Sequence, residues 1–162
     1  MYKKNDYVIY KREVCCIKDI TMINTQQYYI LENLEDPSLK VSLPVSQEKI
    51  LLRALSTFND ITNTLDNLDK IEPLDLQEHN LEEKYKVLLQ GNTLSDLIII
   101  LKTTFLRNKI RENNKKRPSD KDTYYNELAE KYLFNEISYS MQITYNEAKQ
   151  LFFNKLLTSN HS

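Results

Sequence analysis

Side chains that commonly carry out catalysis are scarce in this chain of 162 residues. Its two histidines are His79, in an acidic neighbourhood at an expected helix start, and His161, near the C-terminal end. A Ser-His-Asp or Cys-His arrangement would therefore have to rely on His79. Gly91 is the only glycine, whereas the loops that cradle phosphate groups use several. We expect no catalytic residues, and we expect that the protein is not an enzyme.

The two cysteines, Cys15 and Cys16, are adjacent in a segment that favours β-structure. Neighbouring side chains in a strand point to opposite faces, so we expect one cysteine in the core and the other facing outward. Their spacing fits neither a disulfide framework nor a zinc site. Carboxylate pairs such as Glu82 and Glu83 are interpreted as ordinary surface residues. The sequence thus predicts no metal site and no cofactor.

Charge is distributed unevenly, although the formal net charge is only -1. Acidic residues outnumber basic ones between positions 55 and 92, so this segment should avoid phosphate groups. The balance reverses between positions 107 and 121, where the basic residues are Arg107, Lys109, Arg111, Lys115, Lys116, Arg117 and Lys121. Two interpretations stay open. In the first, the cations are solvent-exposed residues at a helix C-terminus, where the helix dipole favours them. In the second, they contact the DNA backbone through their charge.

The first third of the chain predicts strands. Short segments rich in valine, isoleucine and tyrosine occupy positions 8–10, 14–20, 27–34 and 39–45, and polar or proline-containing breaks separate them. We expect a small β-barrel over 1–54. With one glycine in the chain, asparagines such as Asn24, Asn33 and Asn92 are expected to take its place where the backbone turns.

Helical periodicity follows Pro44. It predicts a short helix over 56–68, a linker over 68–77 that contains Pro73, and a helix over 78–90. Thr93, Ser119 and Thr144 each precede an acidic residue by three positions, which is typical of helix N-caps. The predicted fold class is α+β with two domains: a small N-terminal Tudor/SH3-like β-barrel over 1–54, a short helix and linker over 55–77, and a C-terminal all-α helical bundle over 78–162.

The same segments carry a resemblance to a known family. They are 6–10 (DYVIY), 14–20, 28–31 (YYIL), 40–45 (KVSLPV), 51–53 (LLR) and 80–86 (NLEEKYK). In this order they resemble the CarD/CdnL family of bacterial transcription regulators. That family shares its barrel with the RNA-polymerase-interacting domain of the transcription-repair coupling factor. The resemblance covers nearly the whole chain, and it depends on the order of the elements more than on any one motif.

The resemblance implies two partners. The barrel would bind the β subunit of RNA polymerase through an exposed strand edge. The positions that align with the family's basic docking residues are Ile23 and Ser42, with Met22 and Lys40 alongside. Met22 and Ile23 either form an apolar patch for a partner or belong to the core. The helical domain would contact promoter DNA beside the transcription bubble, without sequence specificity. The expected function is a regulator that modulates the stability of the open promoter complex. An alternative is a protein-interaction module that binds polymerase or another protein without contacting DNA.

In the family, a tryptophan of the helical domain acts as a wedge in the minor groove, whereas this chain has no tryptophan. Leu81 aligns with that position, and Glu82 and Glu83 replace the basic pair that follows it. Leu81 is either a weaker wedge or a buried residue of its own helix. Together with Leu81, the residues expected to contact DNA are Lys84, Lys86, Lys102, Arg107, Arg111, Lys115, Lys116 and Arg117.

The longest apolar run, at 97–101, is far shorter than the roughly 20 residues of a membrane-spanning helix. The chain begins with Met1, Tyr2 and two lysines, which is unlike a signal peptide. We expect a soluble, cytoplasmic protein of bacterial origin, with no membrane partner and no small-molecule substrate.

Overall fold

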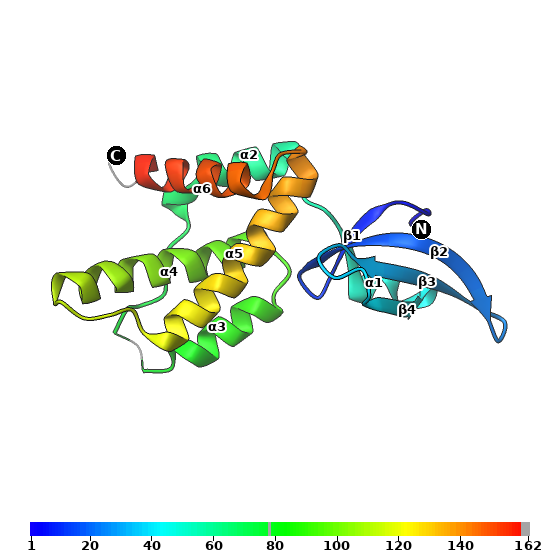
Figure 1. Cartoon of the computed structure of the whole chain (residues 1–162), viewed down its shortest axis with the longest axis horizontal. Helices are drawn as coiled ribbons and strands as arrows, with labels where there is room; N and C mark the ends of the chain where they lie inside the picture. Colours follow the sequence, from blue (N-terminus) through cyan, green and yellow to red (C-terminus); the bar gives the residue numbers. More distant parts are fainter. Residues whose placement is uncertain (78, 160–162) are drawn as a thin grey trace. The chain divides into compact units, whose positions relative to one another are not determined.

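The computed structural model describes residues 1–77 and 79–159, and Figure 1 shows strands in the N-terminal part of the chain and helices after them. Contacts divide the chain into two compact units, Met1–Ser56 and Thr57–Ser162, which we call the sheet unit and the helical unit. The coarse prediction of an α+β chain is confirmed. His161 and Glu78, which the sequence analysis used, lie outside the described residues.

The sheet unit contains five antiparallel strands in the spatial order β4-β3-β2-β1-β5. Their bounds are β1 Tyr7–Tyr10, β2 Glu13–Ile23, β3 Gln26–Asn33, β4 Lys40–Pro44 and β5 Leu52–Ala54. A bulge between Ile17 and Asp19 interrupts the register of β2 against β3. Strand pairing does not join β4 to β5, so these two are edge strands and the expected barrel is not closed. Strand β5 was not predicted as a strand from the sequence.

Two-residue turns connect the first three strands. Lys11 and Arg12 have φ angles of 48° and 70°, and Asn24 and Thr25 have φ angles of 49° and 68°. Positive φ at both central residues matches the right-handed twist of a hairpin. Only Asn24 fulfils the expectation that asparagine replaces glycine at these turns, because lysine, arginine and threonine occupy the other positions.

The sheet packs its apolar side chains on one another in a small core, whose buried members are Val8, Cys15, Ile17, Tyr29, Leu31, Leu43 and Leu52. Cys15 pairs with Val8, and Cys16 pairs with Tyr7, so the two cysteines point to opposite faces. Both are nevertheless buried, at 3% and 5% exposure. The expectation of one cysteine in the core and one on the opposite face is therefore confirmed, with Cys15 in the sheet core, but Cys16 on the other face is buried as well.

A hydrogen-bonded tyrosine ties the ends of the sheet unit together. The Tyr29 hydroxyl donates to the Glu48 carboxylate at 2.6 Å and accepts from the Tyr2 amide at 3.0 Å. Glu48 begins α1 (Glu48–Leu51), which follows the 3-10 turn η1 (Val45–Gln47). Burial, followed by the hydrogen bond to Glu48, raises the pKa of Tyr29 to about 12. Tyr29 thus links β3 to the N-terminal segment and to the connection between β4 and β5.

The helical unit has α-helices on both sides of a central helix pair. Its elements are α2 Phe58–Asp66, η2 Leu68–Lys70, α3 Leu81–Gln90, α4 Leu94–Asn113, α5 Asp120–Met141 and α6 Tyr145–Ser159. Helix α5 packs against α4 and α6, while α3 contacts α4 and α2 contacts α6 (Figure 1). Ile98 and Ile100 of α4 are completely buried. Helix α4 is therefore central in the helical core.

The helix starts follow local hydrogen-bonding signals. Thr93 and Asp96 form a capping box at α4, and Ser119 accepts the Asp122 amide at α5. Thr144 and Glu147 exchange the same pair of hydrogen bonds before α6. These three predicted N-caps are confirmed.

Helix α2 belongs to the helical unit rather than to a separate linker. Ile61, Leu65 and Leu68 lie in the same core cluster as the residues of α4, α5 and α6. The boundary between the units falls between Ser56 and Thr57. The segment 55–77 therefore supplies core residues, although the sequence analysis described it as a short helix and linker.

Two helices end with a non-glycine residue in the left-handed backbone region. Lys115 (φ 56°) follows α4, where its amide bonds to Glu112 and the Lys116 amide bonds to Arg111. Gln142 (φ 56°) follows α5, and its amide bonds to the Ser138 carbonyl. Glycine usually occupies this position because a Cβ atom is strained there.

We predict that Gln142→Gly raises the free energy of unfolding by up to about 1 kcal/mol, because glycine relieves the strain of the left-handed conformation. Gln142 is exposed, so its side chain leaves no cavity. Gln150→Gly is the matched control, since Gln150 is exposed inside α6 and glycine there should cost about 1 kcal/mol. Urea denaturation measures both values, and a destabilising Gln142→Gly would contradict the prediction.

We predict that the sheet unit loses stability as the pH rises above 9. Burial raises the pKa of Cys15 from 9.0 to about 11, and the pKa of Tyr29 rises from 10.0 to about 12. Both groups are neutral acids in the folded state, and their pKa values are higher there than in the unfolded state. Their contribution to the free energy of unfolding is therefore complete at a pH below the unfolded-state pKa, and it is lost as the pH rises through the folded-state pKa. Tyr29→Phe should make the free energy of unfolding less dependent on pH between 10 and 12. An unchanged slope in that variant would exclude this origin.

Candidate functional site

Lys102 of α4 is a core residue. Its side-chain ammonium donates to the carbonyl of Leu68 and, at 2.8 Å, to the carbonyl of Ile71, and the residue is only 8% exposed. Burial lowers the pKa of Lys102. This corrects the prediction that Lys102 contacts DNA, because its ammonium group is directed at the protein backbone.

Two more side chains of α4 hold the segment that follows η2. Thr103 accepts the Leu74 amide at 2.9 Å and donates to the Ile99 carbonyl of its own helix at 2.7 Å. Arg107 donates to the Leu76 carbonyl at 3.3 Å. With Lys102, these residues bind the backbone of 68–76, a segment that has no α-helix or strand. We call Lys102, Thr103 and Arg107 the α4 anchor.

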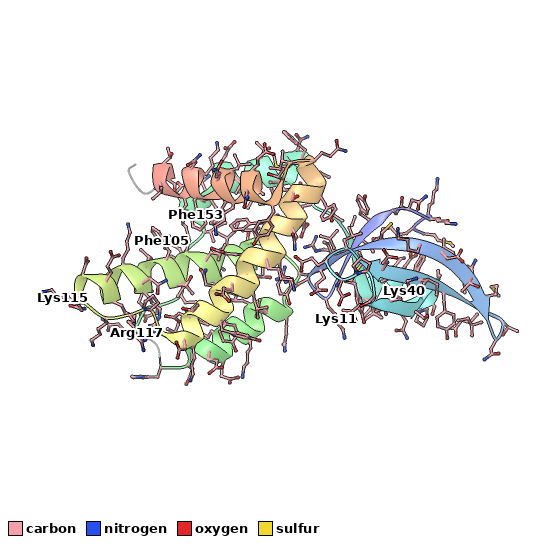
Figure 2. All side chains as sticks on the ribbon, in the orientation of Figure 1. Lys11, Lys40, Phe105, Lys115, Arg117 and Phe153 are labelled. Atoms are coloured by element: carbon pink, nitrogen blue, oxygen red, sulfur yellow. The ribbon has the colours of Figure 1, made fainter. Side chains whose placement is uncertain are left out.

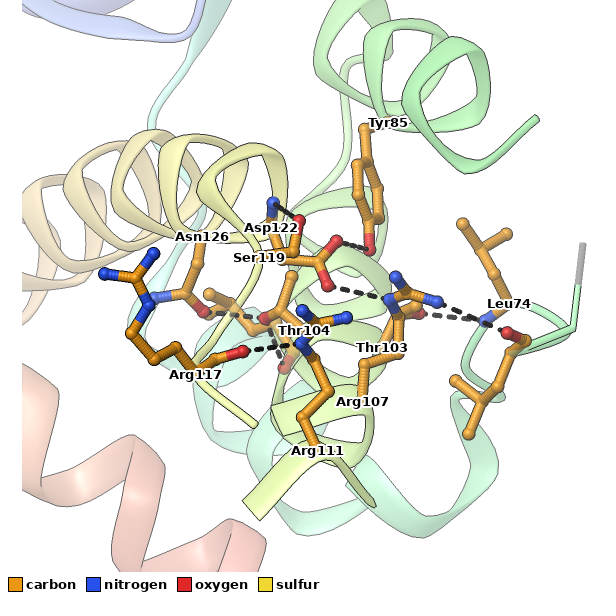
Figure 3. A network of polar contacts seen from close by, with 12 residues as sticks. Leu74, Tyr85, Thr103, Thr104, Arg107, Arg111, Arg117, Ser119, Asp122 and Asn126 are labelled. Carbon is orange, nitrogen blue, oxygen red and sulfur yellow. Dashed lines mark hydrogen bonds and ion pairs between the residues drawn. The ribbon is translucent and has the colours of Figure 1, made fainter. Parts of the chain in front are cut away.

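Arg107 is also part of a buried polar network (Figure 3). Its Nε donates to the Asp122 carboxylate at 2.7 Å, and the Tyr85 hydroxyl donates to the same carboxylate at 3.1 Å. Asp122 is 2% exposed. Burial, followed by the Asp122 charge, raises the pKa of Tyr85. Asp122 therefore joins α3, α4 and α5, and it neutralises most of the Arg107 charge.

The role of Asp122 was not predicted from the sequence. Its position three residues after Ser119 indicated a helix cap, and the amide of Asp122 does bond to Ser119 at 3.2 Å. Nothing in the local spacing indicates that its carboxylate is buried against Arg107. That contact depends on how α4 and α5 pack.

Leu81 is buried at the start of α3. It is 7% exposed and lies in the core cluster with Tyr85 and Leu94. Of the two interpretations of Leu81, the structure supports the one in which Leu81 is a buried residue of its own helix. Leu81 therefore does not present an exposed apolar wedge. The neighbouring Glu82 bonds to Lys121 at 3.1 Å, and this contact lowers the pKa of Glu82.

The two basic residues of α3 are poor phosphate ligands in this arrangement. Lys86 pairs with Glu83 at 3.4 Å, and the charge of Glu83 raises the pKa of Lys86. Lys84 is half-buried and has partners of its own. Both lysines can reach DNA only by giving up part of these contacts.

The cations that remain are gathered at the turn from α4 to α5. Lys115, Lys116 and Arg117 are exposed, and within residues 1–77 and 79–159 their side chains form no hydrogen bond or ion pair. Figure 2 labels Lys115 and Arg117 at this turn. Arg111 donates from Nε to the Arg117 carbonyl at 2.6 Å, which orients its guanidinium but does not neutralise it. We call Arg111, Lys115, Lys116 and Arg117 the basic turn.

The residues expected to bind polymerase are spread along the sheet unit. Met22 and Ile23 lie at the end of β2 and are 60% and 41% exposed. Ile23 pairs with Gln26 near one end of β3, whereas Lys40 pairs with Glu32 near the other. The two pairs are about 20 Å apart, at about 3.3 Å for each strand residue. A single small contact cannot include all of these positions.

Lys40 and Ser42 share the open edge of the sheet. The Asn33 amide bonds to the Leu39 carbonyl at 3.1 Å, which marks these opposite residues as a hydrogen-bonded pair. Because such pairs alternate along an antiparallel ladder, the amide and carbonyl groups of Lys40 and Ser42 point away from β3. Strand β4 therefore presents two unpaired backbone sites, and Pro44, which has no amide hydrogen, ends the row.

The described residues do not form a hydrolase-like site around His79. A pocket of about 170 Å³ is lined by His79, Ser119 and Asp122, among others. However, the Ser119 hydroxyl accepts the helix-capping amide, and the Asp122 carboxylate binds Arg107 and Tyr85. Neither residue is arranged to activate the other through a histidine.

Across residues 1–77 and 79–159 there is no group of three or more His, Cys, Asp or Glu side chains that could hold a metal ion. In the same residues, no helix combines the length and the apolar character needed to cross a membrane. No protein-family model matches the sequence, and a search of curated proteins finds no similar sequence.

We predict that Lys102→Met lowers the free energy of unfolding by about 1–3 kcal/mol, because the partly buried Ile71 carbonyl loses its donor and the segment 68–76 loses an anchor. Lys116→Met is the control: Lys116 is exposed and unpaired among the described residues, so its loss should cost less than about 0.5 kcal/mol. Chemical denaturation followed by circular dichroism measures the difference. Equal effects would show that Lys102 does not anchor the segment.

Proposed function

We propose that the protein is a CarD-like transcription regulator. In this proposal its sheet unit binds the β subunit of bacterial RNA polymerase, and its helical unit contacts promoter DNA without reading sequence. The observation that carries the proposal is the division of binding features between the two units. An open strand edge lies on one, and a group of cations that no carboxylate of the described residues neutralises lies on the other.

The strand order supports a Tudor/SH3-like barrel as the finer description of the sheet unit. The strands follow the order β4-β3-β2-β1-β5, and the 3-10 turn η1 lies in the connection from β4 to β5. A short helical turn before the last strand and an order in which consecutive strands are neighbours are compatible with such a barrel, left open between β4 and β5. The bulge in β2 gives that long strand the bend that such a fold needs.

The edge of β4 supports the polymerase contact. Unpaired backbone groups on an edge strand can add a strand from a partner, and the main-chain hydrogen bonds then supply affinity. Lys40 and Ser42 provide the outward groups, and both side chains are exposed. Met22 and Ile23 lie at the far end of β2 and would form a second, apolar contact.

The basic turn supports the DNA contact. Its cations would neutralise backbone phosphates and release counterions, which requires charge but no specific base contacts. Because Leu81 is buried, the helical unit would act through charge alone, without the wedge of the CarD family. Preferential binding to the open promoter would stabilise it, and each factor of ten in that equilibrium requires about 1.4 kcal/mol.

A second candidate function is a module that binds polymerase or another protein without touching DNA. The burial of Leu81, the burial of Lys102 and the pairing of Arg107 with Asp122 favour it, because these residues were expected to contact DNA. The two candidates share the polymerase contact and differ in the basic turn.

The test of the polymerase contact uses Ser42→Pro. Proline removes the outward amide hydrogen of Ser42 but no hydrogen bond to β3, and edge strands tolerate it. We expect Ser42→Pro to weaken capture of the polymerase β-subunit lobe at least about tenfold, whereas Ser42→Ala should bind like the wild type. Circular dichroism checks that both variants fold. Unchanged capture by a folded Ser42→Pro would exclude the β4 edge as the docking site.

The DNA contact is tested in the same experiment with holoenzyme and promoter DNA. Replacing Lys115, Lys116 and Arg117 together by glutamine should leave capture of the lobe unchanged. It should reduce the salt dependence of promoter binding by a slope of about 2–3, at roughly 0.9 for each lost phosphate contact. An unchanged slope with intact capture would favour the module that does not touch DNA.

A further inference from the structure

A pocket of about 220 Å³ lies at the C-terminal end of α4. Its walls are formed by Leu76, Arg107, Ile110, Arg111, Asn114 and Lys116. Three of the six are cations and none is a carboxylate. The pocket opens beside the basic turn but uses only two of its residues, Arg111 and Lys116.

Among the described residues, no carboxylate pairs with two of the three cations that line this pocket. Arg107 is paired with Asp122, which leaves Arg111 and Lys116. Arg111 binds a neutral carbonyl, that of Arg117, and the Lys116 side chain has no partner among the described residues. Arg111 and Lys116 therefore bring two positive charges to one concave site without an ion-pair partner in the part of the chain that the structure describes.

Helix capping does not account for these cations. Basic side chains often cluster at helix C-termini because they bind the last carbonyl groups. Here the amide of Asn114 binds the Ile110 carbonyl, and the amides of Lys115 and Lys116 bind the carbonyls of Glu112 and Arg111. Backbone groups thus already cap the final turn of α4, and the side chains of Arg111 and Lys116 are left for another ligand.

The shape of the pocket limits that ligand. Its volume is below the roughly 300–1,000 Å³ of pockets that enclose drug-sized molecules. Guanidinium and ammonium donors are the groups that recognise phosphate oxygens, and the arginine fork can bind two of them at once. Leu76 and Ile110 add an apolar wall, and Ile110 is 49% exposed.

We propose that this pocket binds one phosphate group of a small phosphorylated molecule, with Arg111 and Lys116 as its ligands and Leu76 and Ile110 against the organic part. Arg107 contributes its remaining N–H groups from the floor of the site. The site shares Arg111 and Lys116 with the basic turn, but it requires the pocket, whereas the proposed DNA contact requires only an exposed charged surface.

The experiment titrates the full-length protein with three probes: inorganic phosphate, adenosine monophosphate and adenosine. Amide shifts in a two-dimensional NMR spectrum report where each probe binds. We expect saturable shifts around Arg111 and Lys116 with phosphate and with the nucleotide, and none with adenosine. Tighter binding of the nucleotide than of phosphate would indicate use of the apolar wall, whereas equal binding would identify free phosphate as the ligand. Absence of saturation at millimolar concentrations of both would overturn the proposal.

Lys116→Gln and Lys115→Gln form a matched pair of variants. The two lysines are adjacent, exposed and unpaired within the described residues, but only Lys116 lines the pocket. Lys116→Gln should weaken nucleotide binding about tenfold, and Lys115→Gln should change it less than about twofold. Equal weakening would show that diffuse charge, rather than the pocket, attracts the probe. Promoter binding is measured with the same two variants. Both substitutions should weaken promoter binding by the same factor, so this measurement separates failure of this site from failure of the proposed DNA contact.

Discussion

The stability of the helical unit depends on hydrogen-bond partners for the backbone of the segment that enters its core. Residues 68–76 lie against α4 without forming a helix or strand beyond the short turn η2, so their polar groups lack the usual partners. The α4 anchor supplies these partners from the side chains of Lys102, Thr103 and Arg107, which all lie on one helix. An unpaired buried carbonyl or amide costs about 1–3 kcal/mol, so each of these contacts is comparable to a sizeable share of the stability of a small domain.

This constraint also sorts the basic residues of α4. Those in its middle, Lys102 and Arg107, serve the backbone and the buried Asp122. Arg111 near its end and Lys116 in the turn that follows lie beyond the anchored segment, and no carboxylate of the described residues pairs with them. A count of positive charge along the sequence treats these groups alike. Burial and pairing separate them, and in the proposed function the phosphate contacts therefore lie at the end of this helix.

The sequence predicts most of what is encoded locally. The caps at Thr93, Ser119 and Thr144 were recognised because each depends on two residues three positions apart. Strand β5 escaped prediction because its three residues carry no periodic signal, and it exists only through pairing with β1. Lys102 was misplaced for a similar reason. A lysine in an amphipathic helix looks exposed unless the partner backbone, here more than thirty residues earlier in the chain, is known.

The absence of a wedge at Leu81, which departs from the CarD pattern, affects how strongly the helical unit would bind DNA in the proposed function. Without a wedge at Leu81, contacts to DNA by a few exposed cations are weak and sensitive to salt. Weak contacts suffice when a second site on the same chain holds the protein at the promoter, because tethering gives an effective concentration that can reach the millimolar range. In the proposed function, docking through β4 supplies that tether. The strand edge then determines where the protein acts, and the basic turn only has to distinguish one state of the DNA from another.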